Sequence, residues 1–551
     1  MITVGIFGIQ DVGTGPHPMY THDHGIALIK DGKVLTTIQL ERYTRLKHDN
    51  RLPVYIHELL DKYLPCDEEV RFVNTNSFSG SSFISGDGRL RIEPNSQIDI
   101  ENILFPAEMK WYDTDDRQKE AEASVICHEF AHIASVLPFV GEFLPNSLLV
   151  HIDGGASRSA CSFWYWDGNC PKLLEASWDL LKDQVNNFNV NPLAMAILHQ
   201  EEWQHLSLPG KLMGYCGLGK TDSEISDWLK INNWFLDYQG NGTSILDLLN
   251  RRWNTNFTAY NNRSPFFMNL CASIQKDFQE KVIEEIFKFQ EITGAENLYY
   301  SGGAALNIPT NRCLEVSGRF KRIFIPPVTS DSGLALGAAA WMEYLDHGKL
   351  EINSPFINHF GIEQRREHQD DNDDIKKMIF DGKVLGVCNG SAEAGPRALG
   401  HRSLIGLANS REIKERLSEQ IKEREWYRPV APILCEAAAK EVLEDMALKS
   451  ELSHFMLGAY EIVEDSKKDF EGIIHGNDLL RAQIVRSKDR DNQWIYCLLS
   501  ELWEEDGIPA LINTSYNQKG KPIVHYPSEA IDVAGRVGLD GVVINGSLHL
   551  S

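Results

Sequence analysis

Eight lysines and arginines fall between Gly395 and Pro432, although the whole chain carries a formal net charge of −24. Guanidinium groups are planar donor forks that match the oxygens of phosphates and carboxylates. The segment therefore predicts an anion-binding site, with the candidates Arg397, Arg402, Lys422, Arg424 and Arg428. For residues 411–425 an alternative stays open, because glutamates alternate with the basic residues at helical spacing and would give a solvated, salt-bridged helix.

A second group of residues could hold a metal ion. His128 and His132 stand four residues apart, so on a helix both imidazoles face the same side. Asp153 and Asp331 each lie beside a glycine, and two histidines with two carboxylates suit Fe(II) or another first-row ion with open coordination positions. A structural interpretation stays open for each of them: packed histidines, a turn-forming Asp153 and a helix-capping Asp331.

The histidines also belong to the stretch HEFAH, which matches the HExxH pattern of zinc peptidases with Glu129 as general base. The third histidine of the longer HExxHxxGxxH pattern is absent, because Leu137 and Pro138 stand near its place. A zinc peptidase nevertheless stays an alternative.

Glycine turns in three places could bring backbone N–H groups close to phosphates. Each turn alone is weak evidence, but together they favour a nucleotide site in the N-terminal part. The candidates are Gly154, Gly155, Lys211, Gly302, Gly303 and Asn307.

The elements that would position these residues follow an α/β pattern. The segments 1–9, 24–45 and 148–166 predict strands, with a hairpin around the Asp-Gly turn of 24–45. Helices are expected at about 117–138, 272–292 and 331–345. Strand–turn–strand units with an acidic or glycine turn occur twice, which predicts an α/β domain of two similar halves around a nucleotide cleft. A polar stretch at 361–376 indicates a linker, after which a second α/β unit runs to the end.

Length and composition bound the class of protein. A chain of 551 residues is too long for one core, and we expect domains at 1–350 and 377–551 with residues 351–376 as the linker. The acidic balance argues against a nucleic-acid partner. Scattered cysteines, no signal-peptide pattern and no apolar stretch of membrane-spanning length predict a cytoplasmic protein without a membrane partner. The oligomeric state is left open, a homodimer being one option.

Taken together, ten motifs resemble one family, the O-carbamoyltransferases of the nodulation-factor and antibiotic-tailoring type. The motifs include THDHGIAL, LERYTRLKHD, HEFAH, IDGGAS, GKLMGYCG, SGGAALN, AGPRALGHRS, IKEREWYRP and LINTSYNQKG, in order over nearly the whole chain. The resemblance implies an actin-like ATPase-class N-terminal domain and a YrdC-like C-terminal domain. The C-terminal domain would form carbamoyl adenylate from carbamoyl phosphate and ATP with Mg²⁺. The N-terminal domain, holding Fe(II), would pass the carbamoyl group to a hydroxyl of a small natural-product or sugar-like acceptor.

Carried over position by position, the resemblance assigns a role to each candidate. The metal ligands would be His128, His132, Asp153 and Asp331, and His22 would be the base for the acceptor hydroxyl. Carbamoyl phosphate and ATP would be held by Arg397, Lys422, Arg428 and Arg481, with Asn513, Ser515 and Asn517 lining the same site.

The chain departs from the family pattern at several positions. Glu129 replaces the second histidine of HHxxH, and Tyr20 replaces the acid that antibiotic enzymes carry two positions before the catalytic histidine. Residues 10–21 resemble an insertion, and the stretch 475–483 loses an Asp and a Thr. Besides the peptidase, a tRNA threonylcarbamoyl transferase and a hydrogenase-maturation carbamoyltransferase are disfavoured alternatives. A nucleotide-dependent binding protein of the actin-like class is the non-enzymatic one.

Overall fold

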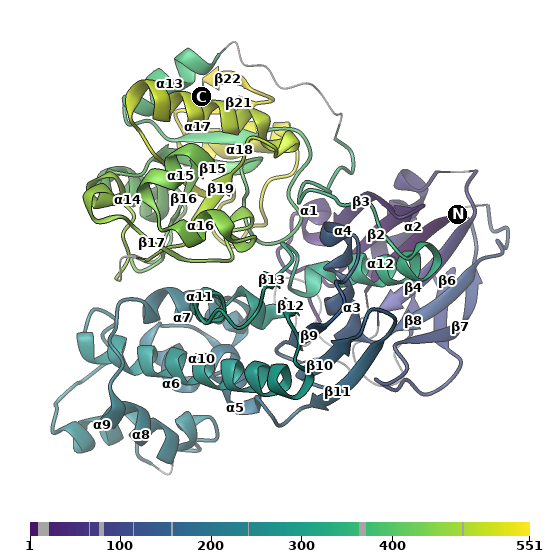
Figure 1. Cartoon of the computed structure of the whole chain (residues 1–551), viewed down its shortest axis with the longest axis horizontal. Coiled ribbons are helices and arrows are strands. Elements are labelled where there is room, and N and C mark those ends of the chain that lie inside the picture. Colours follow the sequence, from purple (N-terminus) through teal and green to yellow (C-terminus); the bar gives the residue numbers. More distant parts are fainter. Residues whose placement is uncertain are drawn as a thin grey trace.

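The computed structural model describes residues 1–8, 21–65, 67–75, 82–113, 115–155, 158–240, 242–362, 371–476 and 479–550. Most of the predicted insertion at 10–21 and part of the predicted linker therefore lie outside the described residues. Figure 1 shows three α/β units, each built on its own sheet. No described helix has both the length and the apolar character needed to cross a membrane.

The first sheet has the strand order β3-β2-β1-β4-β8-β7-β6-β5. β1 pairs antiparallel with β2 and parallel with β4, and β4 pairs parallel with β8. The predicted hairpin is confirmed as β2 and β3, with Asp31 and Gly32 both at positive φ in its turn. The strands are β1 (Ile2–Phe7), β2 (Gly25–Lys30), β3 (Lys33–Gln39), β4 (Val70–Thr75), β5 (Phe83–Ile84), β6 (Leu90–Pro94), β7 (Leu104–Trp111) and β8 (Glu122–Ile126).

The second sheet repeats this arrangement in the order β11-β10-β9-β12-β13. β9 pairs antiparallel with β10 and parallel with β12, and β12 pairs parallel with β13. Strands β3-β2-β1-β4-β8 of the first sheet and the whole second sheet share one order and the same strand directions, which confirms the predicted two-halved, actin-like domain. The strands are β9 (Ser147–Ile152), β10 (Cys161–Trp166), β11 (Pro171–Ser177), β12 (Asn297–Ser301) and β13 (Arg322–Phe324).

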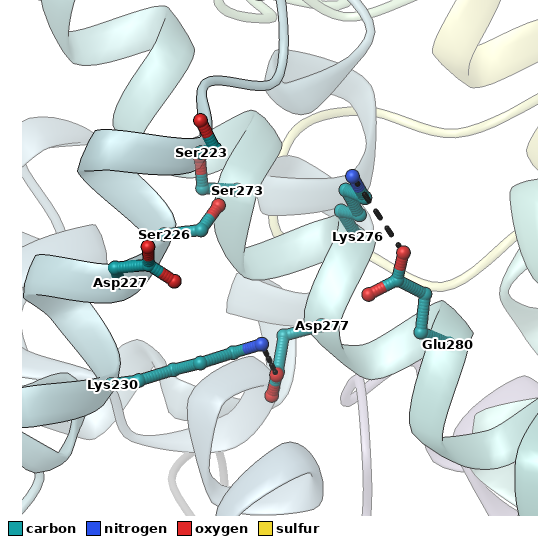
Figure 2. Close-up of a pocket in the computed structure, with 8 residues that line it drawn as sticks. All are labelled: Ser223, Ser226, Asp227, Lys230, Ser273, Lys276, Asp277 and Glu280. Atoms are coloured by element: carbon teal, nitrogen blue, oxygen red, sulfur yellow. Dashed lines mark ion pairs between the residues drawn. The ribbon is translucent and has the colours of Figure 1, made fainter.

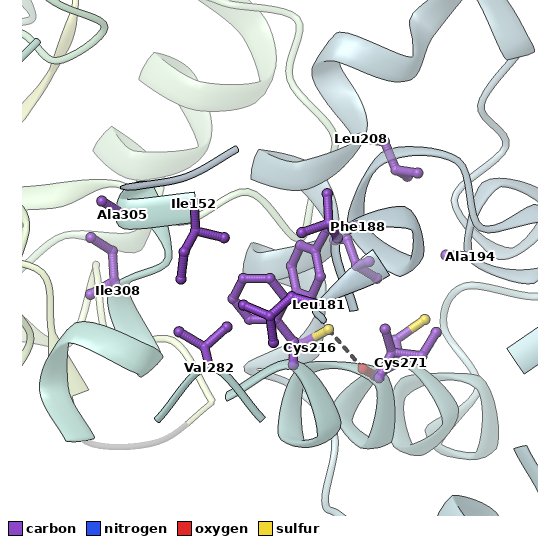
Figure 3. Packing of buried hydrophobic residues seen from close by; sticks show 14 of the residues in the cluster. Ile152, Leu181, Phe188, Ala194, Leu208, Cys216, Cys271, Val282, Ala305 and Ile308 are labelled. Atoms are coloured by element: carbon purple, nitrogen blue, oxygen red, sulfur yellow. Dashed lines mark hydrogen bonds between the residues drawn. The ribbon is translucent and has the colours of Figure 1, made fainter. Parts of the chain in front are cut away.

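Helices between and around these two sheets build the N-terminal core. α12 packs on β1, β2, β4 and α3, and its small residues allow this close approach. The long α10 covers the other side of the second sheet, where Ile152, Phe188 and Val282 belong to one apolar cluster (Figure 3). The helices are α1 (Leu40–Thr44), α2 (Leu52–Tyr63), α3 (His128–Ala134), α4 (Leu137–Val140), α5 (Lys182–Asn189), α6 (Pro192–Ile197), α7 (Leu208–Cys216), α8 (Ser223–Ile231), α9 (Ile245–Trp253), α10 (Pro265–Thr293), α11 (Ile308–Val316) and α12 (Leu334–His347).

One predicted helix is wrong in part. The 117–138 segment contains strand β8 before α3 begins at His128. Pairing with β4 decides the conformation of residues 122–126, and such a partner is invisible to local sequence propensity.

The third sheet has the order β19-β16-β20-β15-β14-β21-β22 and forms the predicted C-terminal α/β unit. Its strands are β14 (Leu385–Cys388), β15 (Arg402–Leu407), β16 (Ala431–Cys435), β19 (Gln483–Val485), β20 (Leu511–Ser515), β21 (Gly541–Ile544) and β22 (Ser547–Leu550), with β17 (Tyr460–Glu461) and β18 (Leu479–Leu480) apart. The helices are α13 (Asn372–Phe380), α14 (Arg411–Glu415), α15 (Glu436–Val442), α16 (Asp445–Lys449), α17 (Gln493–Asp506) and α18 (Pro527–Val537). The predicted domain boundaries at 350 and 376 stay a prediction.

The C-terminal unit contacts both N-terminal halves. From the first half, the buried Arg42 donates to the carbonyl oxygens of Val524 and Gly395. From the second half, Arg322 pairs with Glu451 at 2.6 Å. Sites at these contacts can therefore draw side chains from more than one unit.

Candidate functional site

A cavity between the C-terminal unit and α7 collects four arginines. It is lined by Gly210, Met213, Pro396, Arg397, Ala398, Arg424, Arg428, Pro429, Met456, Arg481, Asn513, Thr514 and Ser515. The structure thus brings together most of the basic residues that the sequence predicted for an anion site. Gly210 and Met213 belong to α7 of the second half, so one wall comes from a unit that sequence reasoning did not connect with this site.

The positive charge of this cavity is largely uncompensated. Among the described residues, the one ion pair made by the four arginines joins Arg428 to Glu425 at 3.7 Å. Burial, and then the neighbouring Arg428, lowers the pKa of Arg397 to about 10 and that of Arg424 to about 9. Burial and the other arginines also lower the pKa of Arg481. Crowded cations that depress each other's pKa values favour an anionic ligand between them.

Beside the cavity, Lys422 lies within a set of polar contacts. Its Nζ donates to Asn517 Oδ1 at 2.7 Å and to Ser515 Oγ at 3.2 Å. Burial, and then Arg424, lowers the pKa of this amine well below its ordinary value. The predicted group Lys422, Ser515 and Asn517 is therefore assembled at the edge of the arginine cavity.

Asn513 holds the loop that carries Arg397. Its Nδ2 donates to the carbonyl oxygen of Ala398 at 3.1 Å and to Gln483 Oε1 at 2.8 Å. Gln483 in turn donates to the carbonyl oxygen of Leu399 at 2.6 Å. These contacts fix the backbone that directly follows Arg397, and Asn513 itself also lines the cavity.

The prediction that Arg402 binds phosphate is wrong. Its fully buried guanidinium donates to the carbonyl oxygens of His525, Asn389, Gly390 and His401 at 2.6–3.1 Å. The protein's own backbone satisfies this side chain, which anchors the start of β15 instead.

The alternative of a helix over 411–425 holds only for the first part of that segment. α14 ends at Glu415 and a π-helical turn continues through Arg416–Ile421. Glu423 then has φ of +48°, which ends the helix before Arg424 and Arg428. Two of the four cavity arginines, Arg424 and Arg428, thus lie on the loop after the helix.

Two predicted nucleotide ligands of the N-terminal part are placed elsewhere. Lys211 on α7 pairs with Glu425 at 2.9 Å, next to the arginine cavity. Asn307 is buried and caps α11, accepting from the backbone N–H of Thr310 and from Gln275 Nε2. That these side chains hold a nucleotide stays a prediction.

The predicted metal residues meet at a second site, between the two N-terminal halves. His128 and His132 begin and end one turn of α3, and their Nε2 atoms lie 3.0 Å apart. Asp331 Oδ1 lies 3.4 Å from His132 Nε2 and 3.8 Å from His128 Nε2. Asp153 Oδ2, at the end of β9, lies 3.7 Å from His132 Nε2.

These residues fit a metal ion. Two donors about 2.1 Å from an ion stand about 3.0–3.4 Å apart at angles of 90–109°, and the distances around His132 are close to this range. His132 Nδ1 is buried and has no partner among the described residues. Although burial lowers it, the pKa of His132 is raised by the hydrogen bond to Asp331 and the charge of Asp153. A set of two imidazoles and two carboxylates suits a divalent first-row ion.

Glycine turns serve this second site. The backbone N–H groups of Gly154 and Gly303 both donate to the Asp153 carboxylate. Gly302 has φ of +98°, and a Cβ there would come 2.2 Å from the carbonyl oxygen of Ile152. The turns thus place Asp153, and contact of these glycines or of Gly155 with a phosphate stays a prediction.

Glu129 does not face the histidines as a peptidase base would. It is fully buried, and its Oε1 accepts from the backbone N–H groups of Arg158 and Ser159 at 2.7 and 2.9 Å. This carboxylate holds the loop after Asp153, so the geometry does not support the peptidase alternative.

His22 lies at the edge of the metal residues. Its Nε2 is 3.9 Å from Asp331 Oδ2, and its Nδ1 is 3.0 Å from Asp23 Oδ2. Although burial lowers it, the pKa of His22 is raised to about 10 by the charge of Asp331 and the hydrogen bond to Asp23. Sequence reasoning missed Asp23 and its second partner, His48, although both stand in the THDHGIAL and LERYTRLKHD motifs.

A further pocket lies between α8 and α10, and its charges are balanced, unlike those of the arginine cavity. Figure 2 shows that its basic side chains are matched by acids: Lys230 pairs with Asp277 at 3.4 Å and Lys276 with Glu280 at 3.6 Å. Balanced charge of this kind does not favour an anion.

Sequence comparisons match both parts of the chain. Residues 107–340 match the carbamoyltransferase N-terminus family, and residues 376–550 match the carbamoyltransferase C-terminus family. The nodulation protein NolNO of Sinorhizobium fredii is 25% identical, over 96% of this chain and 79% of that protein. Nodulation protein U of Azorhizobium caulinodans is 26% identical, over 91% of this chain and 92% of that protein. An uncharacterized protein of Methanocaldococcus jannaschii is 25% identical, over 96% and 98%.

Solved structures give weaker similarities. The activator of 2-hydroxyisocaproyl-CoA dehydratase from Clostridium difficile has a TM-score of 0.32 and 13% identity, over 64% of this chain and all of that chain. Full-length HypF in its phosphate- and nucleotide-bound form has a TM-score of 0.28 and 12% identity, over 63% of this chain and 56% of that one. Both similarities are too slight to add to the sheet order described above.

Proposed function

The chain belongs to the carbamoyltransferase family, and on this premise we propose that it is an ATP-dependent O-carbamoyltransferase acting on a small hydroxyl-bearing acceptor. The observation that carries the proposal is the cavity in which Arg397, Arg424, Arg428 and Arg481 face one another with little compensating charge. Such a site suits substrates that bring several phosphate charges at once.

In the first step, carbamoyl phosphate and ATP react at the arginine cavity. One water is consumed, and carbamoyl adenylate, pyrophosphate and inorganic phosphate are formed, with Mg²⁺ accompanying the nucleotide. The arginines bind the phosphates and offset the charge that develops on them. Asn513 keeps Arg397 in place through the backbone of the 396–399 loop.

In the second step, an acceptor hydroxyl attacks the carbamoyl carbon, and AMP leaves. His128, His132, Asp153 and Asp331 would hold the divalent ion, Fe(II) in our proposal. When bound, this ion supplies positive charge that polarises a carbonyl group and offsets the two carboxylates. Offsetting the charge of Asp331 removes the main cause that raises the pKa of His22, and the neutral His22 then takes the hydroxyl proton at Nε2, which faces Asp331.

Incubation of the full-length protein with ATP, carbamoyl phosphate, Mg²⁺ and Fe(II) tests the proposal. We expect pyrophosphate release that requires carbamoyl phosphate. Arg397→Ala should abolish this release, whereas His128→Ala should leave it intact and block transfer to the acceptor. If His128→Ala also stops pyrophosphate release, the division of steps between the two sites is wrong. If carbamoyl phosphate is never consumed, a nucleotide-dependent binding protein becomes the better interpretation.

A further inference from the structure

Asp23 stands between two histidines. Its Oδ2 lies 3.0 Å from His22 Nδ1, and its Oδ1 lies 2.9 Å from His48 Nδ1. The two imidazole rings are 5.9 Å apart at 76°, so neither ring stacks on the other. Each carboxylate oxygen therefore receives one histidine, at ordinary hydrogen-bond distance.

The backbone is held in a costly conformation to make these contacts. Asp23 has φ of +58° and His48 has φ of +57°, in the left-handed region that non-glycine residues rarely adopt. The two segments are tied together next to the pair, because the backbone N–H of His24 donates to the carbonyl oxygen of Asp49 at 3.1 Å. Strain at two residues that touch each other is typical of a functional arrangement.

From this geometry we infer that Asp23 is the positioning residue for His22, and that His48 holds Asp23 in place. The inference rests on the proposed role of His22 as base. With Nδ1–H donated to Asp23, the His22 ring presents Nε2 toward Asp331, where the acceptor hydroxyl is expected. Asp23 thereby supplies the acid that the sequence lacks at Tyr20.

A metal ion held by His22, Asp23 and His48 is the competing interpretation, because their donor atoms lie within 4.8 Å of one another. The distances favour direct hydrogen bonds between the histidines and Asp23, because the Nδ1 atom of each histidine lies next to its own carboxylate oxygen. The experiment must therefore separate a hydrogen-bonded pair from a second ion.

Histidine-selective NMR of the full-length protein tests the positioning directly. We expect two downfield, hydrogen-bonded Nδ1–H signals, assigned by His22→Gln and His48→Gln. Asp23→Asn should remove at least one, because the amide has one acceptor oxygen. His57→Gln is the control, because His57 contacts a carboxylate away from this site and does so through Nε2, which lies 3.1 Å from Asp87 Oδ1. Both signals persisting in Asp23→Asn would overturn the inference.

Kinetics provide the second readout. With a methyl glucoside as hydroxyl probe, Asp23→Asn should lower kcat for transfer by about 100-fold or more, with KM and pyrophosphate release nearly unchanged. His48→Gln, which keeps a donor toward Asp23, should retain more transfer than His48→Phe. An equal loss of pyrophosphate release would refute a positioning role. If the unmodified protein releases no pyrophosphate, the proposed function fails while the NMR signals still decide the positioning.

A metal titration separates the competing interpretation. The His132→Ala substitution disrupts the metal site of α3, so any Co(II) ion that still binds tightly must bind elsewhere. If adding Asp23→Asn removes this ion, the three residues hold a metal and the hydrogen-bonded arrangement is overturned. We expect Asp23→Asn to leave Co(II) binding unchanged.

Discussion

Replacing Arg397 with methionine should raise the thermal stability of the ligand-free protein and remove its response to phosphate. Arg397 holds a positive charge next to Arg428 without a carboxylate partner among the described residues. Methionine has a similar length and no charge, so it relieves the repulsion and keeps most of the packing. If Arg397 served only to pack the structure, replacing it would lower the thermal stability instead.

The magnitude follows from the pKa of Arg397, which falls from 12.5 to about 10. At about 1.36 kcal/mol per pKa unit this corresponds to about 3 kcal/mol against the charged form. Partial exposure of the side chain reduces the effect to about 1–2 kcal/mol. At neutral pH the arginine is charged in both folded and unfolded chains, so the whole cost falls on the folded state. The melting temperature should rise by about 2–8 °C for a domain of this size.

Differential scanning fluorimetry at low salt, with and without inorganic phosphate and carbamoyl phosphate, measures both effects. A ligand at about 100 times its Kd stabilises the unmodified protein by about 2.7 kcal/mol, and Arg397→Met should lose most of this gain. Arg402→Met is the matched control. It leaves buried carbonyl groups such as those of His525 and Asn389 without a donor, so it should destabilise the protein by about 3 kcal/mol and lower its melting temperature with or without ligand.

Two outcomes would refute the reasoning. If Arg397→Met destabilises the ligand-free protein as Arg402→Met does, the cavity arginines are structural. If Arg397→Met keeps the full phosphate-induced shift, the anion binds elsewhere.

Three further changes test other parts of the structure. Burial raises the pKa of Glu315 to about 7, so the stability contributed by its protonated form is complete below its ordinary pKa near 4.5 and is lost as pH rises through 7. Between pH 5 and 8, melting curves should therefore show the stability of Glu315→Gln rising by about 2 kcal/mol relative to that of the unmodified protein. A difference that does not change with pH would contradict this. Gly337→Ala places a Cβ 1.8 Å from a backbone oxygen of α3 and should lower the stability of the protein by about 3 kcal/mol or more. Gly535→Ala is the matched control in α18, where a Cβ meets open space, and should stabilise the protein by about 0.5–1 kcal/mol. Equal shifts of the two melting temperatures would be inconsistent with this packing. Lys211→Met removes one partner of Glu425, which is then free to pair more closely with Arg428 and to compete with the substrate's phosphate. The KM for carbamoyl phosphate should therefore rise several-fold in initial-rate pyrophosphate assays. An unchanged KM would show that α7 does not shape the site.

Elements with a strong internal pattern could be predicted from the sequence. The Asp-Gly turn predicted the β2–β3 hairpin, the amphipathic pattern near 272–292 predicted α10, and the glycine-containing turn before 334 predicted the start of α12. β8 was missed because its conformation depends on pairing with β4, which lies some 50 residues earlier. Partners far away in the sequence decide such segments.

The site was predictable where residue spacing alone fixes geometry. His128 and His132 share a face because an α-helix puts residues four apart on one side. Arg397 and Arg402 lie in one motif, yet one lines the cavity and the other is saturated by backbone carbonyls. Residue type cannot tell these roles apart, because a guanidinium group suits phosphate oxygens and carbonyl oxygens equally. The difference arises only when the third sheet assembles around β15.

The Asp23–His48 contact shows how a predicted element can reveal more than its own shape. A hairpin whose strands pair Gly25 with Gln39 must return the chain to the edge from which it started. The residues before Gly25 and those after Gln39 are therefore neighbours, whatever follows in the fold. Asp23 lies just before the hairpin and His48 lies after α1 (Leu40–Thr44), so their contact depends on α1 as well as on the hairpin. A change that shifts this register by one residue would move the side chains of one strand to the opposite face of the sheet, and it should separate Asp23 from His48 without touching either side chain.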